Sequence, residues 1–141
     1  MRLTMFTDYG LRVLLVLASR RDGLVTNAEI SAAFSISDAH LMKVAHALVR
    51  TGWVEAVRGR NGGLRLAADP RRLDLRRIVE TLESDFALVE CFGPENACRL
   101  TGGCGVERVL ADALRKFHEE LARHTLADLV ARSPALQKLP L

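Results

Sequence analysis

Three cysteines are the residues of this chain best suited to chemistry. Cys91, Cys98 and Cys104 are the three cysteines of the 141 residues, separated by six and then five positions. An odd number of closely spaced thiols makes a poor disulfide framework, because one is always left over. The same thiols make a good partial ligand set for a metal ion or an iron–sulfur cluster that takes its last ligand from elsewhere.

Other occupants of the cysteine segment remain open. Structural zinc sites usually contain cysteine pairs about two to four residues apart and four protein ligands, and this segment has neither. A loop of metal-free, redox-sensing thiols is another alternative. A small iron–sulfur enzyme or electron carrier is a third, although we find no nucleophile–base pair and no phosphate-binding loop. Local candidates for a further ligand are Glu90, Glu95, Asn96 and Glu107.

The composition limits the class of protein. A length of 141 residues favours one domain, and 49% apolar with only 5% aromatic residues suits helices. The apolar run Val13–Ala18 is too short to span a bilayer, and Asp8 and Arg12 interrupt the region where a signal peptide needs its apolar core. We expect a cytoplasmic protein with no membrane partner, where reduced thiols favour metal or redox chemistry.

The net charge of +3 lies in the first half of the chain. Residues 1–70 carry nine Lys and Arg against six Asp and Glu, whereas residues 71–141 carry eleven of each. A basic front and a neutral rear are typical of a nucleic-acid-binding protein. Scatter in a small sample would give the same imbalance, so charge alone does not decide.

The first half predicts two short helices joined by a tight turn. Leucines at helical spacing predict a helix over residues 8–20. Thr26 and Glu29 form a capping box, which opens a second helix that ends at Phe34. The turn Ser35–Ser37 supplies a second N-cap serine, and a third helix follows it.

This third helix and the next segment complete a winged helix-turn-helix. The helix covers residues 37–50 and ends at Thr51-Gly52, since glycine is the usual left-handed stop. Weak alternation over residues 53–57 and 64–67 predicts two strands around a glycine-rich tip, with Trp53 in the core. Such units read DNA with the second helix of the motif.

The candidate DNA-contacting residues lie on the polar face of this helix and on the wing. Near the N-terminus of a recognition helix, side chains reach base edges in the major groove, while wing cations suit phosphates or the minor groove. The candidates are Ser37, Asp38, Ala39, His40, Lys43, Arg50, Arg58, Arg60 and Asn61.

The second half predicts a sensing and assembly region. We expect a helix over residues 74–83, the irregular cysteine loop over 85–104, a long helix over 105–124 that forms the dimer seam, and a short capped helix after Thr125. The mainly α-helical chain divides into a DNA-binding domain, a cluster-binding loop and a dimerisation helix with its tail, over residues 1–83, 84–104 and 105–141.

Three segments resemble a known family. His40–Ala67, Met1–Arg12 and Val89–Phe92 are similar to the bacterial regulator family that contains IscR and NsrR, and the match runs from residue 1 to about 130. Among its members the chain looks most like the nitric-oxide-sensing NsrR type.

The resemblance implies a ligand set. In IscR-like members a histidine three residues after the last cysteine completes the set, but Glu107 stands there. In NsrR-like members an aspartate near the N-terminus of the partner subunit supplies the ligand, and Asp8 matches that position. Arg12, one turn on, would orient Asp8. From the residues alone, the favoured interpretation of Asp8 is a first-turn carboxylate stabilised by the helix dipole.

The implied function is that of a regulator and not of an enzyme. By resemblance, the chain is a homodimeric repressor that binds a palindromic operator of double-stranded DNA. It senses nitric oxide through an iron–sulfur cluster, 4Fe-4S with 2Fe-2S as the alternative, and nitrosylation releases the DNA of nitric-oxide-detoxification genes. The alternatives are a 2Fe-2S cluster-assembly or redox sensor of the IscR type and a cluster-free thiol switch.

Overall fold

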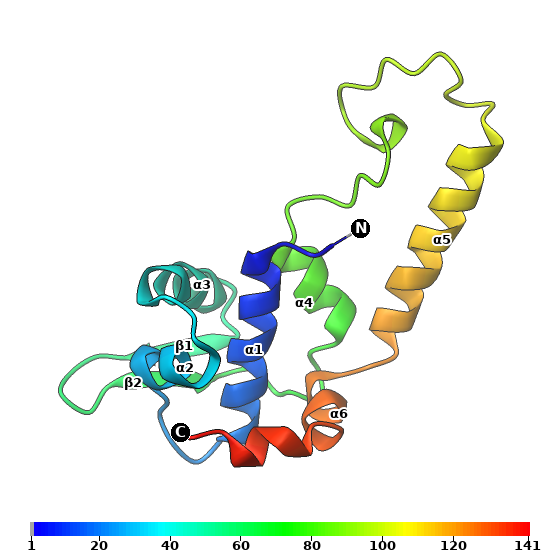
Figure 1. The fold of residues 1–141 in the computed structure, drawn as a ribbon. Helices are drawn as coiled ribbons and strands as arrows, with labels where there is room; N and C mark the ends of the chain where they lie inside the picture. Colours follow the sequence, from blue (N-terminus) through cyan, green and yellow to red (C-terminus); the bar gives the residue numbers. More distant parts are fainter. Residues whose placement is uncertain (1) are drawn as a thin grey trace.

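The chain folds as a mainly helical winged helix-turn-helix from which one long helix and the cysteine loop project (Figure 1). The computed structural model describes residues 2–141. Its elements are α1 (Met5–Ser19), α2 (Asn27–Phe34), α3 (Asp38–Arg50), β1 (Val54–Val57), β2 (Gly63–Leu66), α4 (Leu75–Leu82), the 3-10 turn η1 (Glu90–Phe92), α5 (Gly105–Ala122), α6 (Leu126–Ala131) and the 3-10 turn η2 (Pro134–Lys138). The expected fold class is confirmed.

Side-chain caps set where the helices begin. Thr26 and Glu29 form the expected capping box of α2, and Ser37 caps α3. The first helix begins earlier than the expected residue 8, because Thr4 caps it: the Thr7 N–H donates to Thr4 Oγ1 at 3.3 Å. A cap satisfies helix N–H groups that have no partner within the helix, so the first turn of α1 includes Asp8.

The core surrounds α1 and includes the end of the chain. α6 and η2 lie across α1, and Leu126 of α6 is 0% exposed. The Leu75 N–H donates to the carbonyl of His124, and the Leu126 N–H donates to that of Leu73, both at 2.8 Å. These two bonds fasten the end of α5 beside the start of α4. The largest fully buried side chains include Leu14, Leu17, Ile30, Leu41, Leu48, Leu73 and Ile78.

The wing is a two-stranded antiparallel hairpin. Val54 of β1 lies opposite Leu66 of β2, and Glu55 opposite Arg65. The two charged side chains pair across the strands at 2.8 Å, as opposite charges on one face of a hairpin do. Trp53 is 5% exposed, so the expectation that it belongs to the core is confirmed.

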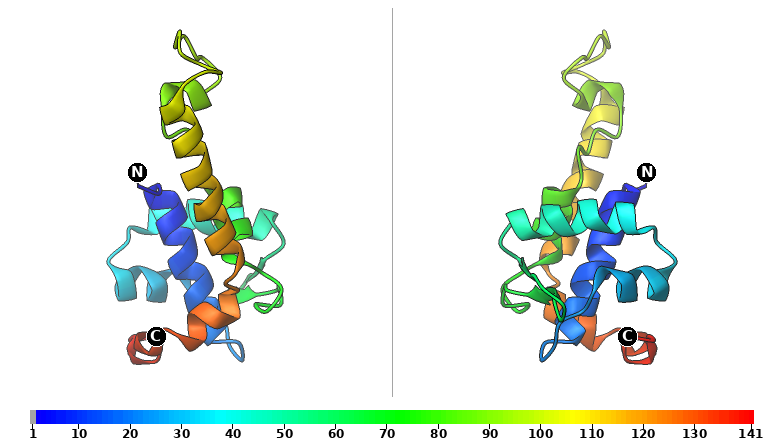
Figure 2. Two further views of the ribbon diagram at one scale, coloured as in Figure 1. Left: turned by 90° about the vertical axis from the view of Figure 1, so that its right-hand side faces the viewer. Right: turned by 90° about the vertical axis from the view of Figure 1, so that its left-hand side faces the viewer.

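α5 and the cysteine loop form an arm that extends beyond the winged helix-turn-helix (Figure 2). α5 packs on α4, and the Phe86 ring meets the His118 ring edge-on at 4.6 Å. In its 18 residues α5 contains no buried residue, and Val106 and Val109 are 63% and 68% exposed. None of the helices in residues 2–141 is long and apolar enough to cross a bilayer.

Candidate DNA interface and cysteine loop

One face of α3 carries an exposed stripe of one alanine and three polar residues. Ala39, Lys43, His46 and Arg50 are spaced by four, three and four residues, which places them on one side of a helix. All four are exposed. The opposite side of α3 contributes Leu41, Val44, Ala45 and Leu48 to the core. Core packing therefore fixes which side chains the helix presents outward.

Cations of this stripe meet a wing arginine around a groove. Lys43, His46, Arg50 and Arg58 line a cavity of about 680 Å³ whose remaining walls are apolar and include Phe6 of α1. No acidic side chain is among its lining residues, and none of the ion pairs in residues 2–141 involves its Lys or Arg side chains. Unneutralised cations around a concave surface attract phosphate.

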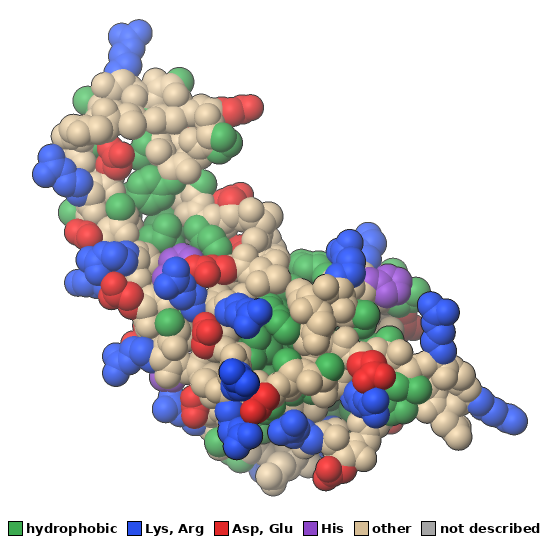
Figure 3. All heavy atoms as spheres, turned by 180° about the vertical axis from the view of Figure 1, so that it is seen from behind, with side chains coloured by type: hydrophobic (Ala, Val, Ile, Leu, Met, Phe, Trp, Pro, Cys, Tyr) green, Lys and Arg blue, Asp and Glu red, His purple; other side chains and the backbone are tan. Residues whose placement is uncertain are grey.

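The groove gathers three of the expected residues and adds four others, among them His46 and Phe6. His46 and Phe6 were not among the candidates, although the spacing of His46 from Lys43 already places it on the stripe. Figure 3 shows blue and purple side chains gathered at the end of the molecule formed by α3 and the wing. Arg60 and Asn61 lie exposed at the wing tip. DNA contact by each residue stays a prediction.

The start of α3 is held by contacts with its own N-cap residue and with α1. Ser37 Oγ lies 2.9 Å from His40 Nδ1 and accepts from the His40 N–H at 3.4 Å. The Tyr9 and His40 rings lie 6.2 Å apart, centroid to centroid. Asp38 and Ala39 are exposed in the first turn of α3. α1 thus contacts the end of the recognition helix that we expect to meet base edges.

The cysteine loop keeps its three thiols unpaired. All three are free, with Cys91 and Cys104 partly buried and Cys98 exposed. Over residues 2–141, no three His, Cys, Asp or Glu side chains are gathered closely enough to hold a metal ion. The loop therefore brings the thiols into one segment but does not assemble them around a point.

Three of the four local candidates for a further ligand bind the loop's own backbone. Glu90 accepts from the Ala97 N–H at 3.0 Å, and Glu107 accepts from the Gly102 N–H at 2.9 Å. Asn96 accepts from the Cys98 N–H at 2.9 Å. These bonds shape the loop. Glu95, the fourth candidate, is exposed to solvent.

The chemical character of the three thiols suits them as ligands of an iron–sulfur cluster. Cys104 is the N-cap of α5, and its sulfur makes no side-chain cap bond. Partial burial raises the pKa of the Cys91 thiol, and nearby negative charge from Glu107, Cys98 and Cys104 raises that pKa further. Thiolates that repel one another in this way are stabilised by a shared cation, and each must lose its proton to bind one.

Asp8 lies on α1 and is held by Arg12. The guanidinium donates to both carboxylate oxygens, at 3.2 and 2.7 Å, and lies 5.5 Å over the Phe34 ring at the end of α2. The expected pairing of the two side chains is present. The role of Asp8 as a ligand for the cluster of a second subunit stays a prediction.

Comparison with known proteins assigns the chain to a family. The model of the family described as "Rrf2: Iron-dependent Transcriptional regulator" matches residues 3–132. The chain belongs to the Rrf2 family. It is 43% identical to the Rrf2 relative "HTH-type transcriptional regulator NsrR" of Bacillus subtilis over 141 residues, covering 99% of this chain and 97% of that one. The protein of the same name from Geobacillus kaustophilus is also 43% identical, over 99% and 96% of the two chains.

Solved structures show the same Rrf2 fold. IscR of T. potens superposes with a TM-score of 0.75 at 24% identity, covering 97% of this chain and 91% of that one. CymR, the global cysteine regulator of B. subtilis, superposes with a TM-score of 0.75 at 23% identity, over 94% and 98%. These two structures show the fold alone, a winged helix. The family match and the curated relatives identify the chain as a transcriptional regulator, and the relatives' names point away from an enzyme.

Proposed function

We propose that this chain is a homodimeric, cytoplasmic repressor that binds palindromic operator DNA and releases it in response to nitric oxide. Cys91, Cys98 and Cys104, with Asp8 of the partner subunit, would hold a 4Fe-4S cluster. The observation that carries the DNA half is the cationic groove between α3 and the wing. The regulated genes would be those of nitric-oxide detoxification, as the resemblance to NsrR proteins implies.

The exposed side of α5 supports a dimer. Val106 and Val109 are more than half exposed, and an apolar helix side in water favours a partner. A second copy of α5 would cover it and create a two-fold axis. Two recognition helices related by that axis would read two half-sites in successive major grooves.

Asp8 and Arg12 of α1 support a sensor whose cluster has one weak ligand. When bound, the cluster would supply iron atoms to which nitric oxide can bind. Carboxylate is a harder and weaker ligand for such iron than thiolate, so Asp8 would mark its most open position. In this chain the Arg12 guanidinium lies 2.7 Å from Asp8 Oδ2. Arg12 would therefore orient the carboxylate toward the cysteine loop of the partner subunit.

Anaerobic purification tests the proposal. We expect coloured protein with iron and sulfide, and a loss of operator binding during titration with nitric oxide. Asp8→Ala should leave folding intact but loosen the cluster or blunt this response. Asp22→Ala, a matched change in the exposed turn after α1, should leave both unchanged. Colourless protein with zinc, or an Asp8→Ala variant with an unaltered spectrum and response, would contradict the proposal.

A thiol switch is the second candidate, because all three cysteines are free and Cys98 is exposed. It predicts operator binding that changes reversibly with disulfide oxidation in iron-free protein. Mass spectrometry of the oxidised chain would identify the bond. A redox-cycling 2Fe-2S sensor of the IscR type would differ in holding half as much iron and half as much sulfide per subunit as a 4Fe-4S protein, and in its absorption spectrum.

A further inference from the structure

The caps of three helices in this chain differ in one respect. In α2 and α6 the threonine cap is completed locally, because Glu29 accepts from the Thr26 N–H and Asp128 from the Thr125 N–H. In α1 the equivalent position is occupied by Thr7, a buried side chain without a carboxylate. The box of α1 must be completed from elsewhere.

Glu83 completes it from another helix. Its Oε2 accepts from the Thr4 N–H at 2.9 Å and from the Thr4 hydroxyl at 3.2 Å. Thr4 in turn accepts from the Thr7 N–H. The carboxylate also sits at the positive end of the α1 dipole. The first turn of α1 therefore depends on a residue 79 positions away in sequence.

Glu83 stands at the foot of the cysteine loop. It is the C-cap of α4, and the loop region, residues 84–104, follows directly. The preceding residue, Leu82, packs so closely on α1 that a Cβ on Gly10 would lie 2.5 Å from Leu82 Cδ1. Hydrogen bonds and packing together fix the end of α4 against the first two turns of α1.

The same two turns contact the DNA-reading helix on their other side. Phe6 lines the cationic groove, and the Tyr9 ring meets the His40 ring. Asp8 lies between them in sequence. A shift in the first turn of α1 would therefore move the proposed ligand and the support of α3 together.

We infer that Glu83 is a positioning residue that caps α1 from the foot of the cysteine loop and thereby couples the loop to the recognition helix within one subunit. The regulatory part of this inference rests on the proposed function; the cap itself does not. A change in the loop that draws the end of α4 away would uncap α1. The route acts in addition to any ligand from the partner subunit.

Hydrogen exchange of cluster-free protein tests the cap. In Glu83→Ala we expect the amide protection of Thr7, Asp8 and Tyr9 to fall roughly tenfold, as for loss of a hydrogen bond to a charged acceptor. Glu83→Gln, which keeps an acceptor but loses the charge, should give an intermediate value and serves if the alanine variant does not fold. Asp22→Ala is the matched control at the other end of α1. Unchanged protection in both Glu83 variants would overturn the inference.

Operator binding tests the coupling. We expect Glu83→Ala to bind operator DNA roughly threefold to tenfold more weakly than wild type, although the side chain lies away from the cationic groove. Lost amide protection with unchanged DNA affinity would overturn the coupling. If wild-type protein holds no iron while both Glu83 effects occur, the cap and coupling stand and the proposed cofactor fails.

Discussion

Replacing Lys43 or Arg58 by alanine should weaken operator binding and flatten its dependence on salt. Both side chains line the cationic groove, and neither takes part in an ion pair among residues 2–141. A cation that neutralises a DNA phosphate releases a condensed counterion, so its contribution depends on the salt concentration. A cation already paired with a carboxylate releases far less.

The size of the effect follows from counting contacts. Each phosphate contact contributes about 0.9 to the slope of log K against log salt concentration. A dimer loses two copies of the contact, so either variant should lower the slope by about 1.8. Between about 50 and about 200 mM salt, the affinity ratio of wild type to variant should then shrink about tenfold.

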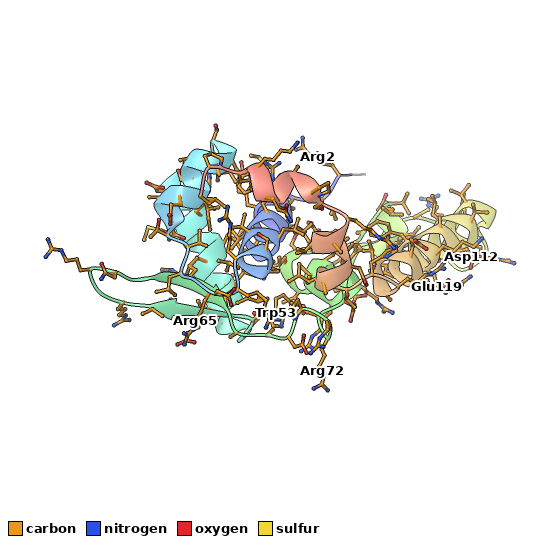
Figure 4. The ribbon with its side chains drawn as sticks, turned by 90° about the horizontal axis from the view of Figure 1, so that it is seen from below. Arg2, Trp53, Arg65, Arg72, Asp112 and Glu119 are labelled. Carbon is orange, nitrogen blue, oxygen red and sulfur yellow. The ribbon has the colours of Figure 1, made fainter. Side chains whose placement is uncertain are left out.

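Fluorescence anisotropy with labelled operator DNA over a salt series would measure both slopes. The matched control is Arg65→Ala, which removes the same charge from the wing. Arg65 projects from β2 (Figure 4) and is paired with Glu55 at 2.8 Å, so its loss should change the slope little. Equal slopes in wild type and the Lys43 and Arg58 variants, or a larger change in the control, would refute the placement of the DNA interface.

Three further outcomes test the folded frame. Gly10→Ala places a Cβ 2.5 Å from a side chain of α4 and should lower the free energy of unfolding, measured in urea, by about 1–3 kcal/mol. The control Gly23→Ala, where a Cβ would meet nothing within 4 Å, should not lower it. Equal stabilities of the two variants would contradict the close approach of α1 and α4. Leu126→Ala should cost about 2–5 kcal/mol in the same assay, and no loss would exclude α6 from the core. The pKa of Glu29 is lowered chiefly by the backbone N–H of Thr26. Its stabilisation is therefore present above the ordinary pKa of 4.5 and disappears as the pH falls through the lowered folded value, so the melting temperatures of wild type and Glu29→Gln should converge in acid; a constant gap would contradict this.

Local signals predicted most of the fold. The capping box at Thr26, the cap at Ser37 and the stop at Gly52 all lie within a few residues of what they control, and the structure confirms each. The start of α1 lies earlier than the sequence predicts: Thr4 caps the helix locally, and the rest of the cap comes from Glu83, in a distant part of the sequence. No pattern within one segment carries such a contact.

The sites could be predicted only in part. The spacing of Lys43 and Arg50 on a helix predicted an outward cationic face, but the wing had to fold before Arg58 could join them. The position of Phe6 in the groove could not be predicted from its sequence neighbours, because α1 contacts α3 only in the tertiary fold. The type and number of the cysteines indicate a ligand set. Their spacing does not say whether they gather around one point, and among residues 2–141 they do not.

The backbone bonds between residues 73–75 and 124–126 give the arm an architectural independence. They bring the end of α5 back to the point where α4 begins, so the cysteine loop and α5 leave the core after α4 and return to it at one place. The loop and α5 can change in length or ligands while the backbone bonds at their base stay the same, and Glu83 remains the contact through which such a change reaches α1. One DNA-reading frame can in this way be fitted with different sensors, and the arm of this chain is one interchangeable part.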